Sequence, residues 1–371
     1  LPRRWVPVAY LAAVLYITQG QAVDFIGVNF MAIRFVELTA FLRVLFRGEL
    51  PAGKLLPTDR WLIRALAAYS LIFTLRSGEI NMYQIGLLVD GLLTYYVFRG
   101  LIADWEDFRF VMKGAVYLLL PFALLMEYES YSGTNLFAAM GGVPETPVFR
   151  EGYYRCQASF RHAITAGTLG ATFLPLCIGF LFDKSTRKWA LLGIIACVGI
   201  VLASHSSGPL MAAVIAMTAW GCWVFRDRMH LVRRAILAAL VILHFAMSRP
   251  VWFIFDRISG VLGGDGWHRA ILIDRFIEHA REWWLFGMPM AQTEEWAATV
   301  TKFGYVDMTN YYVSLGVNGG LLSLACFVVM LIACLKQLGR GLQALRTAPR
   351  ETAVFEPVLW GVGSAIIAHA L

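Results

Sequence analysis

The sequence has 371 residues, of which 58% are hydrophobic and 15% are charged. With a mean hydropathy of +0.63, it is too apolar for a soluble domain. Runs of about 17–25 apolar residues recur along it, as the hydrocarbon core of a bilayer requires. The formal net charge of +7 lies in blocks between these runs. Such blocks orient a protein in a membrane, so we do not expect nucleic acid as a partner.

The apolar runs predict an all-α fold, in which residues 1–371 form one polytopic membrane domain of about eleven transmembrane helices. The bundle has a twelfth helix if the chain, which starts without Met and stops inside an apolar run, is trimmed from a longer protein. No signal-peptide cleavage site follows Leu1. In chain order, the predicted spans are 6–19, 23–46, 61–76, 80–98, 108–126, 163–182, 188–204, 208–225, 231–248, 311–335 and 355–371.

Lysine and arginine predict the orientation of these spans. They concentrate on one side of the membrane, which the positive-inside rule makes the cytoplasmic side. Two long polar loops, 127–162 and 249–310, then face outward, and the longer one is expected to contain amphipathic helices. Loops of this length are usually functional. The basic segments are the N-terminus with Arg3 and Arg4 and the loops 47–60, 183–188, 226–234 and 336–350.

Several charged residues fall within the predicted spans, where charge is costly and commonly functional. Arg34 and Glu37 lie three positions apart on the second span, so they share a helix face and are spaced to pair. Arg43 on the same span and Asp90 on the fourth have two interpretations. They either act within the membrane or reach its cytoplasmic interface.

The first outer loop ends in a group of cations. Arg155, Arg161 and His162 stand just before the span that begins at Ala163. A single arginine at a membrane boundary is commonly only an anchor. Three cationic side chains beside the unpaired amide N–H groups of a helix start suit an anion better. We therefore predict an anion-binding site there.

The second outer loop contains a stretch with a clear helical period, from Trp267 to Trp284. Its apolar residues recur at three- and four-residue steps, and Arg269 projects onto their face. Burying a guanidinium there is costly unless an anion or a carbonyl receives it. Two interpretations carry equal weight. Arg269 either caps carbonyl groups or snorkels past the helix end, or its planar fork holds a diphosphate.

Weaker candidates lie nearby. His268, Arg275 and His279 share one polar stripe of the same helix, as solvated amphipathic helices often do. Asn310 is a good N-cap for the tenth span. Asp307, three residues earlier, places a carboxylate at the outer membrane boundary, where it is a candidate general base.

Metal and nucleotide chemistry have no support in the sequence. It contains no Walker loop, no HExxH and no CxxC, and its outer histidines are not spaced as a zinc pair with a third ligand. We predict that the protein uses neither a metal nor a cofactor.

Three stretches in order carry a resemblance to a known family. They are Arg155-Cys-Gln-Ala-Ser-Phe-Arg161-His162 before a helix, His268-Arg269-Ala-Ile-Leu-Ile followed by Trp284-Leu-Phe-Gly287, and Thr309-Asn310-Tyr-Tyr followed by Gly319-Gly320-Leu-Leu. Together with the short Ser204-His205-Ser206-Ser207-Gly208 turn, they resemble the O-antigen polymerase and ligase superfamily of bacterial inner-membrane glycosyltransferases. The resemblance covers about residues 150–335.

The resemblance implies a multi-pass protein of the bacterial inner membrane whose active site faces the periplasm. Its substrate is a glycan linked to undecaprenyl diphosphate, and its partners are membrane lipids, a chain-length regulator and a flippase. An acceptor hydroxyl attacks the anomeric carbon without a metal, and arginines neutralise the leaving diphosphate. The expected catalytic residues are Arg269, Asp307 and His268, and the expected diphosphate- or glycan-binding residues are Arg155, Arg161, His162, Arg275, His279 and Asn310.

One departure bears on the subclass. Ligases of this family typically have a histidine before the asparagine that opens the late helix, and this chain has Thr309 there. A polymerase of lipid-linked repeat units is therefore the first prediction, and a ligase is the alternative. A transporter of an anionic solute is the alternative of a different class. Two related halves are common in transporters, and the sequence has no such symmetry.

Overall fold

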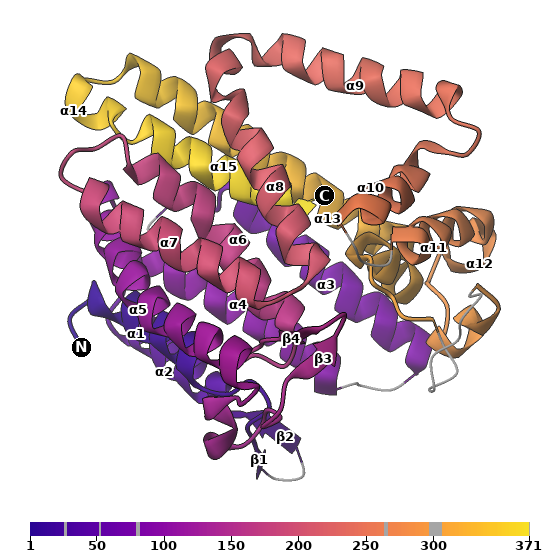
Figure 1. The fold of residues 1–371 in the computed structure, drawn as a ribbon, viewed down its shortest axis with the longest axis horizontal. Coiled ribbons are helices and arrows are strands. Elements are labelled where there is room, and N and C mark those ends of the chain that lie inside the picture. The colour runs from indigo at the N-terminus through magenta and orange to yellow at the C-terminus, as the bar shows by residue number, and fades with distance from the viewer. Residues whose placement is uncertain (26–27, 52, 79–81, 263–265, 297–305, 371) are drawn as a thin grey trace. The chain divides into compact units, whose positions relative to one another are not determined.

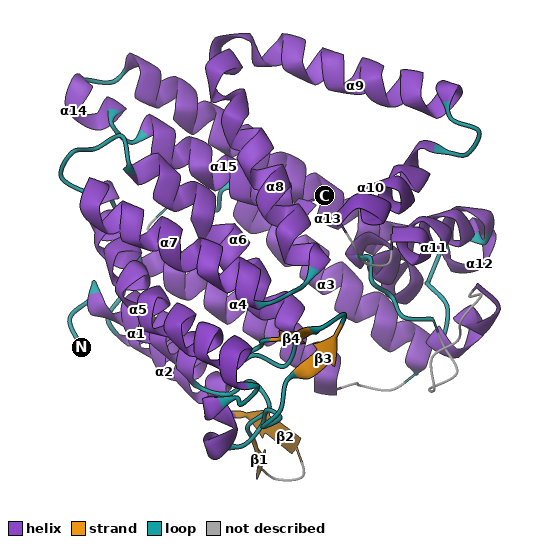
Figure 2. Cartoon of the chain, viewed as in Figure 1, coloured by secondary structure: helices purple, strands orange, loops and turns teal. Residues whose placement is uncertain are grey.

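The computed structural model describes residues 1–371 apart from 26–27, 52, 79–81, 263–265, 297–305 and 371. The described chain is mostly helical, and its β structure consists of two short hairpins (Figure 2). The predicted all-α class is confirmed. The chain divides into two compact units, whose segments can be traced by the colour bar of Figure 1. Unit 1 comprises Leu1–Gly53, Asp90–Trp223 and Gln337–Leu371, and unit 2 comprises Lys54–Val89 and Val224–Lys336.

Unit 1 is built around three long helices and the C-terminal one. Helices α5 (Trp105–Ser132), α6 (Ala163–Phe180), α7 (Arg187–Ala203) and α15 (Glu356–Ala370) pack against one another, and α8 (Ser207–Gly221) lies on α6 and α15. Its other elements are α1 (Trp5–Tyr16), β1 (Ala22–Phe25), β2 (Val28–Met31), α2 (Ala32–Phe46), η1 (Leu136–Met140), β3 (Val148–Arg150), β4 (Tyr153–Arg155) and α14 (Arg350–Ala353). Two of the four unit boundaries fall within α4 (Met82–Leu101) and α13 (Tyr311–Thr347).

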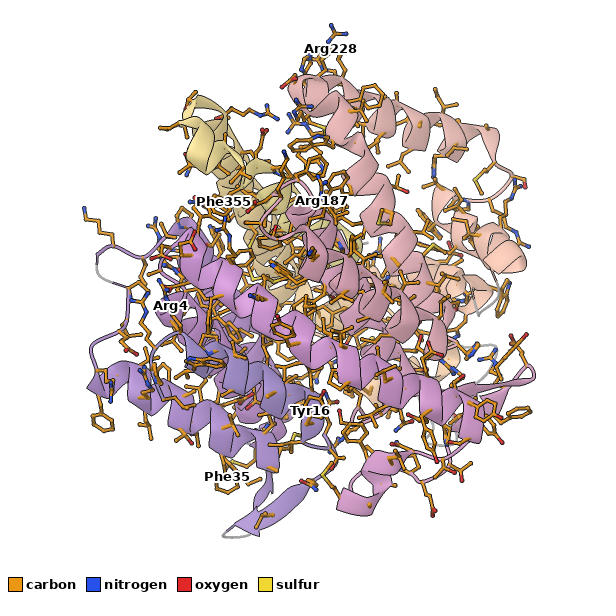
Figure 3. The ribbon with its side chains drawn as sticks, turned by 60° about the vertical axis from the view of Figure 1, so that its left-hand side comes forward. Arg4, Tyr16, Phe35, Arg187, Arg228 and Phe355 are labelled. Atoms are coloured by element: carbon orange, nitrogen blue, oxygen red, sulfur yellow. The ribbon has the colours of Figure 1, made fainter. Side chains whose placement is uncertain are left out.

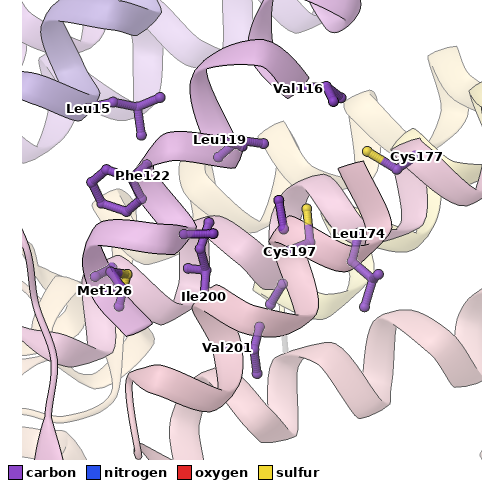
Figure 4. Close-up of a cluster of buried hydrophobic side chains, with 14 of the residues drawn as sticks. Leu15, Val116, Leu119, Phe122, Met126, Leu174, Cys177, Cys197, Ile200 and Val201 are labelled. Atoms are coloured by element: carbon purple, nitrogen blue, oxygen red, sulfur yellow. The ribbon is translucent and has the colours of Figure 1, made fainter. Parts of the chain in front are cut away.

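The core of unit 1 forms where α5, α6 and α7 meet (Figure 4). Small residues allow these helices to approach closely, as in other membrane bundles. At Gly170 of α6, for example, an added Cβ would lie 2.6 Å from the carbonyl oxygen of Cys197 on α7. Fully buried residues of this core include Val116, Phe122, Met126, Cys177, Cys197 and Ile200.

Helix α1 is fastened to α5 at both of its ends, which Figure 3 marks with Arg4 and Tyr16. Arg3 and Arg4 both pair with the buried carboxylate of Asp107 near the start of α5, Arg4 at 2.6 Å. At the other end, the Tyr16 hydroxyl donates to the Leu118 carbonyl at 2.8 Å. These bonds fix where the chain leaves α1, close to the loop that precedes α6.

Unit 2 has a smaller core, formed by Leu272, Trp283, Trp296, Val313 and Val317 with their neighbours. Helix α9 contributes no buried residue to it. Its elements are α3 (Pro57–Ser77), α9 (Met229–Ala246), η3 (Val251–Phe253), α10 (Ile254–Leu262), α11 (Gly266–Glu278), α12 (Ala280–Trp283), η4 (Met290–Trp296) and the first part of α13, and η2 (Cys222–Arg228) lies at its boundary with unit 1.

Among the described residues, four helices are long and apolar enough to cross a membrane: Trp105–Ser132, Ala163–Phe180, Ser207–Ala246 and Tyr311–Thr347. The prediction of about eleven spans does not agree with this number. Hydropathy alone does not reveal where an apolar stretch stops being helical. The predicted span 23–46 contains the β1–β2 hairpin, and the predicted spans 208–225 and 231–248 belong to one long helical segment.

Several other predicted spans are short helices. Helix α1 has 12 residues, α2 and α15 have 15 each and α7 has 17. At about 1.5 Å per residue, none reaches the roughly 30 Å of a hydrocarbon core without help from flanking residues. Helix α3 is longer, with 21 residues, but its sequence includes Asp59, Arg60, Arg64 and Arg76.

The predicted pairing of Arg34 with Glu37 is not the one that forms. The Arg34 guanidinium instead donates two hydrogen bonds to Asp90 on α4, at 2.8 and 2.9 Å. Glu37 accepts from the Tyr10 hydroxyl at 2.9 Å. The two parallel bonds to Asp90 use the planar fork of the arginine, which is the strong form of an arginine–carboxylate pair. Asp90 is therefore the partner of Arg34 on a neighbouring helix.

Candidate functional site

The segment between β4 and α6, residues 156–160, is buried along its whole length, and we call it the buried loop. Glu129, near the end of α5 and only 1% exposed, holds its backbone. One carboxylate oxygen accepts the N–H of Gln157 at 3.1 Å, and the other accepts the N–H of Ala158 at 2.8 Å. Hydrogen bonds to a charged acceptor are stronger than neutral ones. A carboxylate therefore fixes a loop in which Ala158 has a φ of +50°.

Further hydrogen bonds tie the buried loop to the rest of unit 1. The Asn135 amide donates to the Ala158 carbonyl at 2.9 Å. The Ser159 hydroxyl donates to the Leu15 carbonyl at 2.6 Å, and the Gln157 amide donates to the Phe160 carbonyl at 2.9 Å. The loop is a rigid support. It presents Arg155 at one end and Arg161 with His162 at the other.

Arg155 is half-buried at the end of β4. Its Nη2 donates to the Ser206 hydroxyl at 2.9 Å. Burial lowers the pKa of this guanidinium, and the nearby Arg150 lowers it further. A guanidinium has five N–H donors, so Arg155 has donors for an anion as well as for Ser206. A bound anion would offset the free-energy cost of removing the Arg155 guanidinium from water.

Arg161 and His162 are exposed at the start of α6. The Arg161 Nε donates to the Gln19 carbonyl at 3.2 Å. His162 is the N-cap, and its side chain makes no capping bond. Two of the three predicted cations, Arg161 and His162, therefore stand at the start of α6. Arg155, in contrast, is held apart from the other two by the buried loop.

The turn between α7 and α8 completes this part of unit 1. His205 stacks on Tyr153 of β4, with ring centroids 4.6 Å apart. Its Nε2 lies 3.5 Å from the Ser130 hydroxyl. Sequence reasoning noticed the turn but missed His205, Ser130, Tyr153 and Glu129 as possible site residues. The sequence did contain one signal that could have identified His205, namely a histidine in a tight turn between two apolar helices.

In unit 2, the predicted helix from Trp267 to Trp284 is divided between α11 and α12, with a break at His279. Its predicted apolar face packs in the core of this unit. Arg269 is half-buried on α11. Within the part of the chain that the structure describes, its guanidinium makes no hydrogen bond or ion pair. One interpretation required Arg269 to donate to carbonyl groups. No such bond is found among the described residues.

The structure brings His268 to Asp307. The His268 Nε2 lies 2.9 Å from the Asp307 backbone carbonyl oxygen and donates to it. The side chain of Asp307 is exposed. Asn310 caps α13 as predicted, since its side-chain oxygen accepts the amides of Tyr312 at 2.9 Å and Val313 at 3.2 Å.

The two remaining predicted residues have partners on their own segment. Arg275 pairs with Glu278 at 2.6 Å, and His279 pairs with Glu282 at 2.7 Å. The His279 ring also stacks on Trp296, at 5.2 Å. These pairs reduce the charge that either residue offers to a ligand.

Two of the stretches that carry the family resemblance dock on each other. The Met288 amide donates to the Val317 carbonyl at 2.7 Å, and the Leu321 amide donates to the Trp284 carbonyl at 2.8 Å. Gly320, with a φ of +65°, interrupts α13 at this place. Arg76 of α3 donates to the carbonyls of Met288 and Val317 at 2.7 and 3.0 Å. These glycine-containing stretches therefore have a structural role in unit 2.

Unit 2 also contains a cleft of about 300 Å³ between α9 and α10. It is lined by Met247, Ser248, Arg249, Phe253, Asp256 and Arg257. Sequence reasoning did not single out its two arginines. Across the described residues, no three or more His, Cys, Asp or Glu side chains are grouped as a metal site. No protein-family model matches the sequence, and no curated protein matches it.

Proposed function

We propose that the protein is an inner-membrane glycosyltransferase that polymerises oligosaccharide repeat units carried on undecaprenyl diphosphate. The reaction takes place at the periplasmic face and needs no metal. One observation carries the proposal. A half-buried arginine, Arg155, is fixed by Ser206 beside a rigid buried loop, which suits a preorganised anion site.

The chemistry follows from the leaving group. An acceptor hydroxyl attacks the anomeric carbon of the donor sugar, and the lipid diphosphate departs with its negative charge. A guanidinium fork donates two parallel N–H bonds to phosphate oxygens. Because Arg155 is held in place before the reaction, it stabilises the charge without reorganising as the bond breaks.

Unit 2, taken by itself, offers a second candidate for anion binding. Arg269 is half-buried, and no hydrogen bond or ion pair of its guanidinium is found within the described residues. We propose that it can bind a phosphate group. Asp307, with an exposed carboxylate, is a candidate base. His268 fixes the backbone of Asp307 through its carbonyl and thereby positions this carboxylate.

The alternatives differ in what accepts the glycan or in the class of protein. A ligase would use the same chemistry with another acceptor. A transporter of an anionic solute has one observation in its favour, the buried Glu37. This residue is 6% exposed, and among the described residues one of its carboxylate oxygens has no hydrogen-bond partner. Buried carboxylates are common in ion pathways.

Binding of undecaprenyl diphosphate to the purified full chain tests the proposal. We expect Arg155→Ala to weaken binding by about 10–100-fold, the usual effect of losing charge-assisted hydrogen bonds of about 1.5–3 kcal/mol. Arg155→Lys should recover little, because an ammonium lacks the fork. Arg187→Ala is the control, since Arg187 is an exposed arginine at the start of α7. Equal affinity of the wild type and Arg155→Ala would remove the observation on which the proposal rests.

A further inference from the structure

The backbone of His205 is strained. Its φ of +38° lies in the left-handed region, which glycine adopts freely and other residues adopt at a cost of about 1–3 kcal/mol. The residue forms the turn between α7 and α8, where its amide donates to the Leu202 carbonyl at 3.0 Å. A glycine would serve the turn better. A histidine at this position therefore indicates that its side chain has a role that a glycine could not fill.

The surroundings of the turn keep His205 in this conformation. The amide of Cys156, in the buried loop, donates to the Ala203 carbonyl at 3.2 Å. The Ser204 hydroxyl donates to the Val201 carbonyl at 2.7 Å. Helix α6 passes so close that a Cβ at Gly167 would lie 2.4 Å from the Ser204 hydroxyl oxygen. Strain that is maintained by surrounding packing is typical of functional sites.

The side chain of His205 lies in a polar group that is open to solvent. Its ring is nearly parallel to that of Tyr153, with an angle of 11° and a centroid distance of 4.6 Å, and Tyr153 is 59% exposed. The Ser130 hydroxyl lies 3.5 Å from Nε2. Two positions after Tyr153 on β4, and so on the same side of the strand, Arg155 donates to Ser206. The His205 imidazole, stacked on Tyr153, and the Arg155 guanidinium, bonded to Ser206, therefore lie at neighbouring positions of β4 and the turn.

We propose that His205, in place of Asp307, is the catalytic base of the glycan transfer, an inference that rests on the proposed function. Its imidazole accepts the proton of the acceptor hydroxyl as the oxygen attacks the anomeric carbon. A bond forms between the acceptor oxygen and this carbon, and the bond from the carbon to the diphosphate oxygen breaks. The electron pair stays on the diphosphate, which Arg155 holds, and the proton then passes from His205 to the diphosphate. Ser130 and Tyr153 orient the ring.

Two substitutions separate a base from a turn residue. His205→Gly removes the imidazole and the strain together. His205→Asn keeps a polar side chain that tolerates the left-handed backbone but takes up no proton. With lipid-linked repeat units extracted from the native membranes, we expect each variant to lower the rate of glycan elongation by about 10²–10⁴-fold. Affinity for undecaprenyl diphosphate should stay near that of the wild type, and added imidazole should restore part of the activity of His205→Gly.

His230→Ala is the control, because His230 is an exposed histidine of α9. Normal elongation by either His205 variant overturns the assignment, and so does a loss that imidazole does not reverse in His205→Gly. If the wild type itself elongates no glycan, the proposed function fails and the role of His205 fails with it. If the wild type and His230→Ala elongate glycan and only the His205 variants do not, the loss of elongation is assigned to the missing base and the proposed function stands.

Discussion

At the residue scale, the two candidate arginines differ in what surrounds them. Arg155 is held by Ser206, whereas Arg269 has no hydrogen bond or ion pair within the described chain. A half-buried guanidinium that has no protein partner among the described residues can still receive an anionic ligand. An anionic ligand would therefore gain more from Arg269 than from a solvated arginine on the same helix.

This difference predicts the effect of substituting Arg269. Arg269→Ala should abolish glycan elongation while the protein still folds in the membrane, and Arg269→Lys should recover little activity. Arg281→Ala is the control, because Arg281 is exposed on α12. Elongation rates and the elution profiles of the purified variants provide the measurement. Near-normal elongation by Arg269→Ala, or a variant that no longer folds, would show that the residue is structural.

At the element scale, the buried loop depends on Glu129 of α5. Removing the carboxylate leaves the amides of Gln157 and Ala158 without acceptors in a buried place, at a cost of about 1–3 kcal/mol each. We therefore expect Glu129→Ala to loosen the loop, and Glu129→Gln to do so less.

Cys156 reports on this loosening. It is fully buried, and its burial raises the pKa of the thiol to about 12. Near pH 8, the wild-type thiol is therefore protonated and inaccessible, and a maleimide should label it slowly. In Glu129→Ala, the thiol gains water, its pKa falls, and labelling of the peptide that contains Cys156 should rise as followed by mass spectrometry. Fast labelling in the wild type, or slow labelling in both proteins, would contradict the role of Glu129.

At this scale, the sequence predicted where helices start but not which distant residues bond to one another. The starts of α6 and α13 at Ala163 and Tyr311 agree with the predictions because polar residues stop abruptly there. The Glu129 bonds were not predictable, since each joins residues 28 or 29 positions apart. The stacking of His205 on Tyr153 likewise depends on the packing of α7 against α5. Hydropathy also overestimated the number of spans, because it does not distinguish an apolar helix from an apolar hairpin.

At the scale of the whole molecule, the proposal requires both long polar segments to face the periplasm. The distribution of lysine and arginine favours this orientation. A reporter that is active only in the periplasm should be active when fused after Glu294 and silent when fused after Gly341. The reverse pattern would place Arg269 and Asp307 on the cytoplasmic side and remove the periplasmic reaction.

The central claim is that arginines, rather than a metal ion, neutralise the departing diphosphate. Its most direct test is elongation of lipid-linked repeat units, extracted from the native membranes, by the purified full chain in excess chelator. We expect a ladder of longer glycans whose rate of formation is unchanged by the chelator and is lower in Arg155→Ala. Elongation that stops in chelator and returns with magnesium or manganese would contradict it.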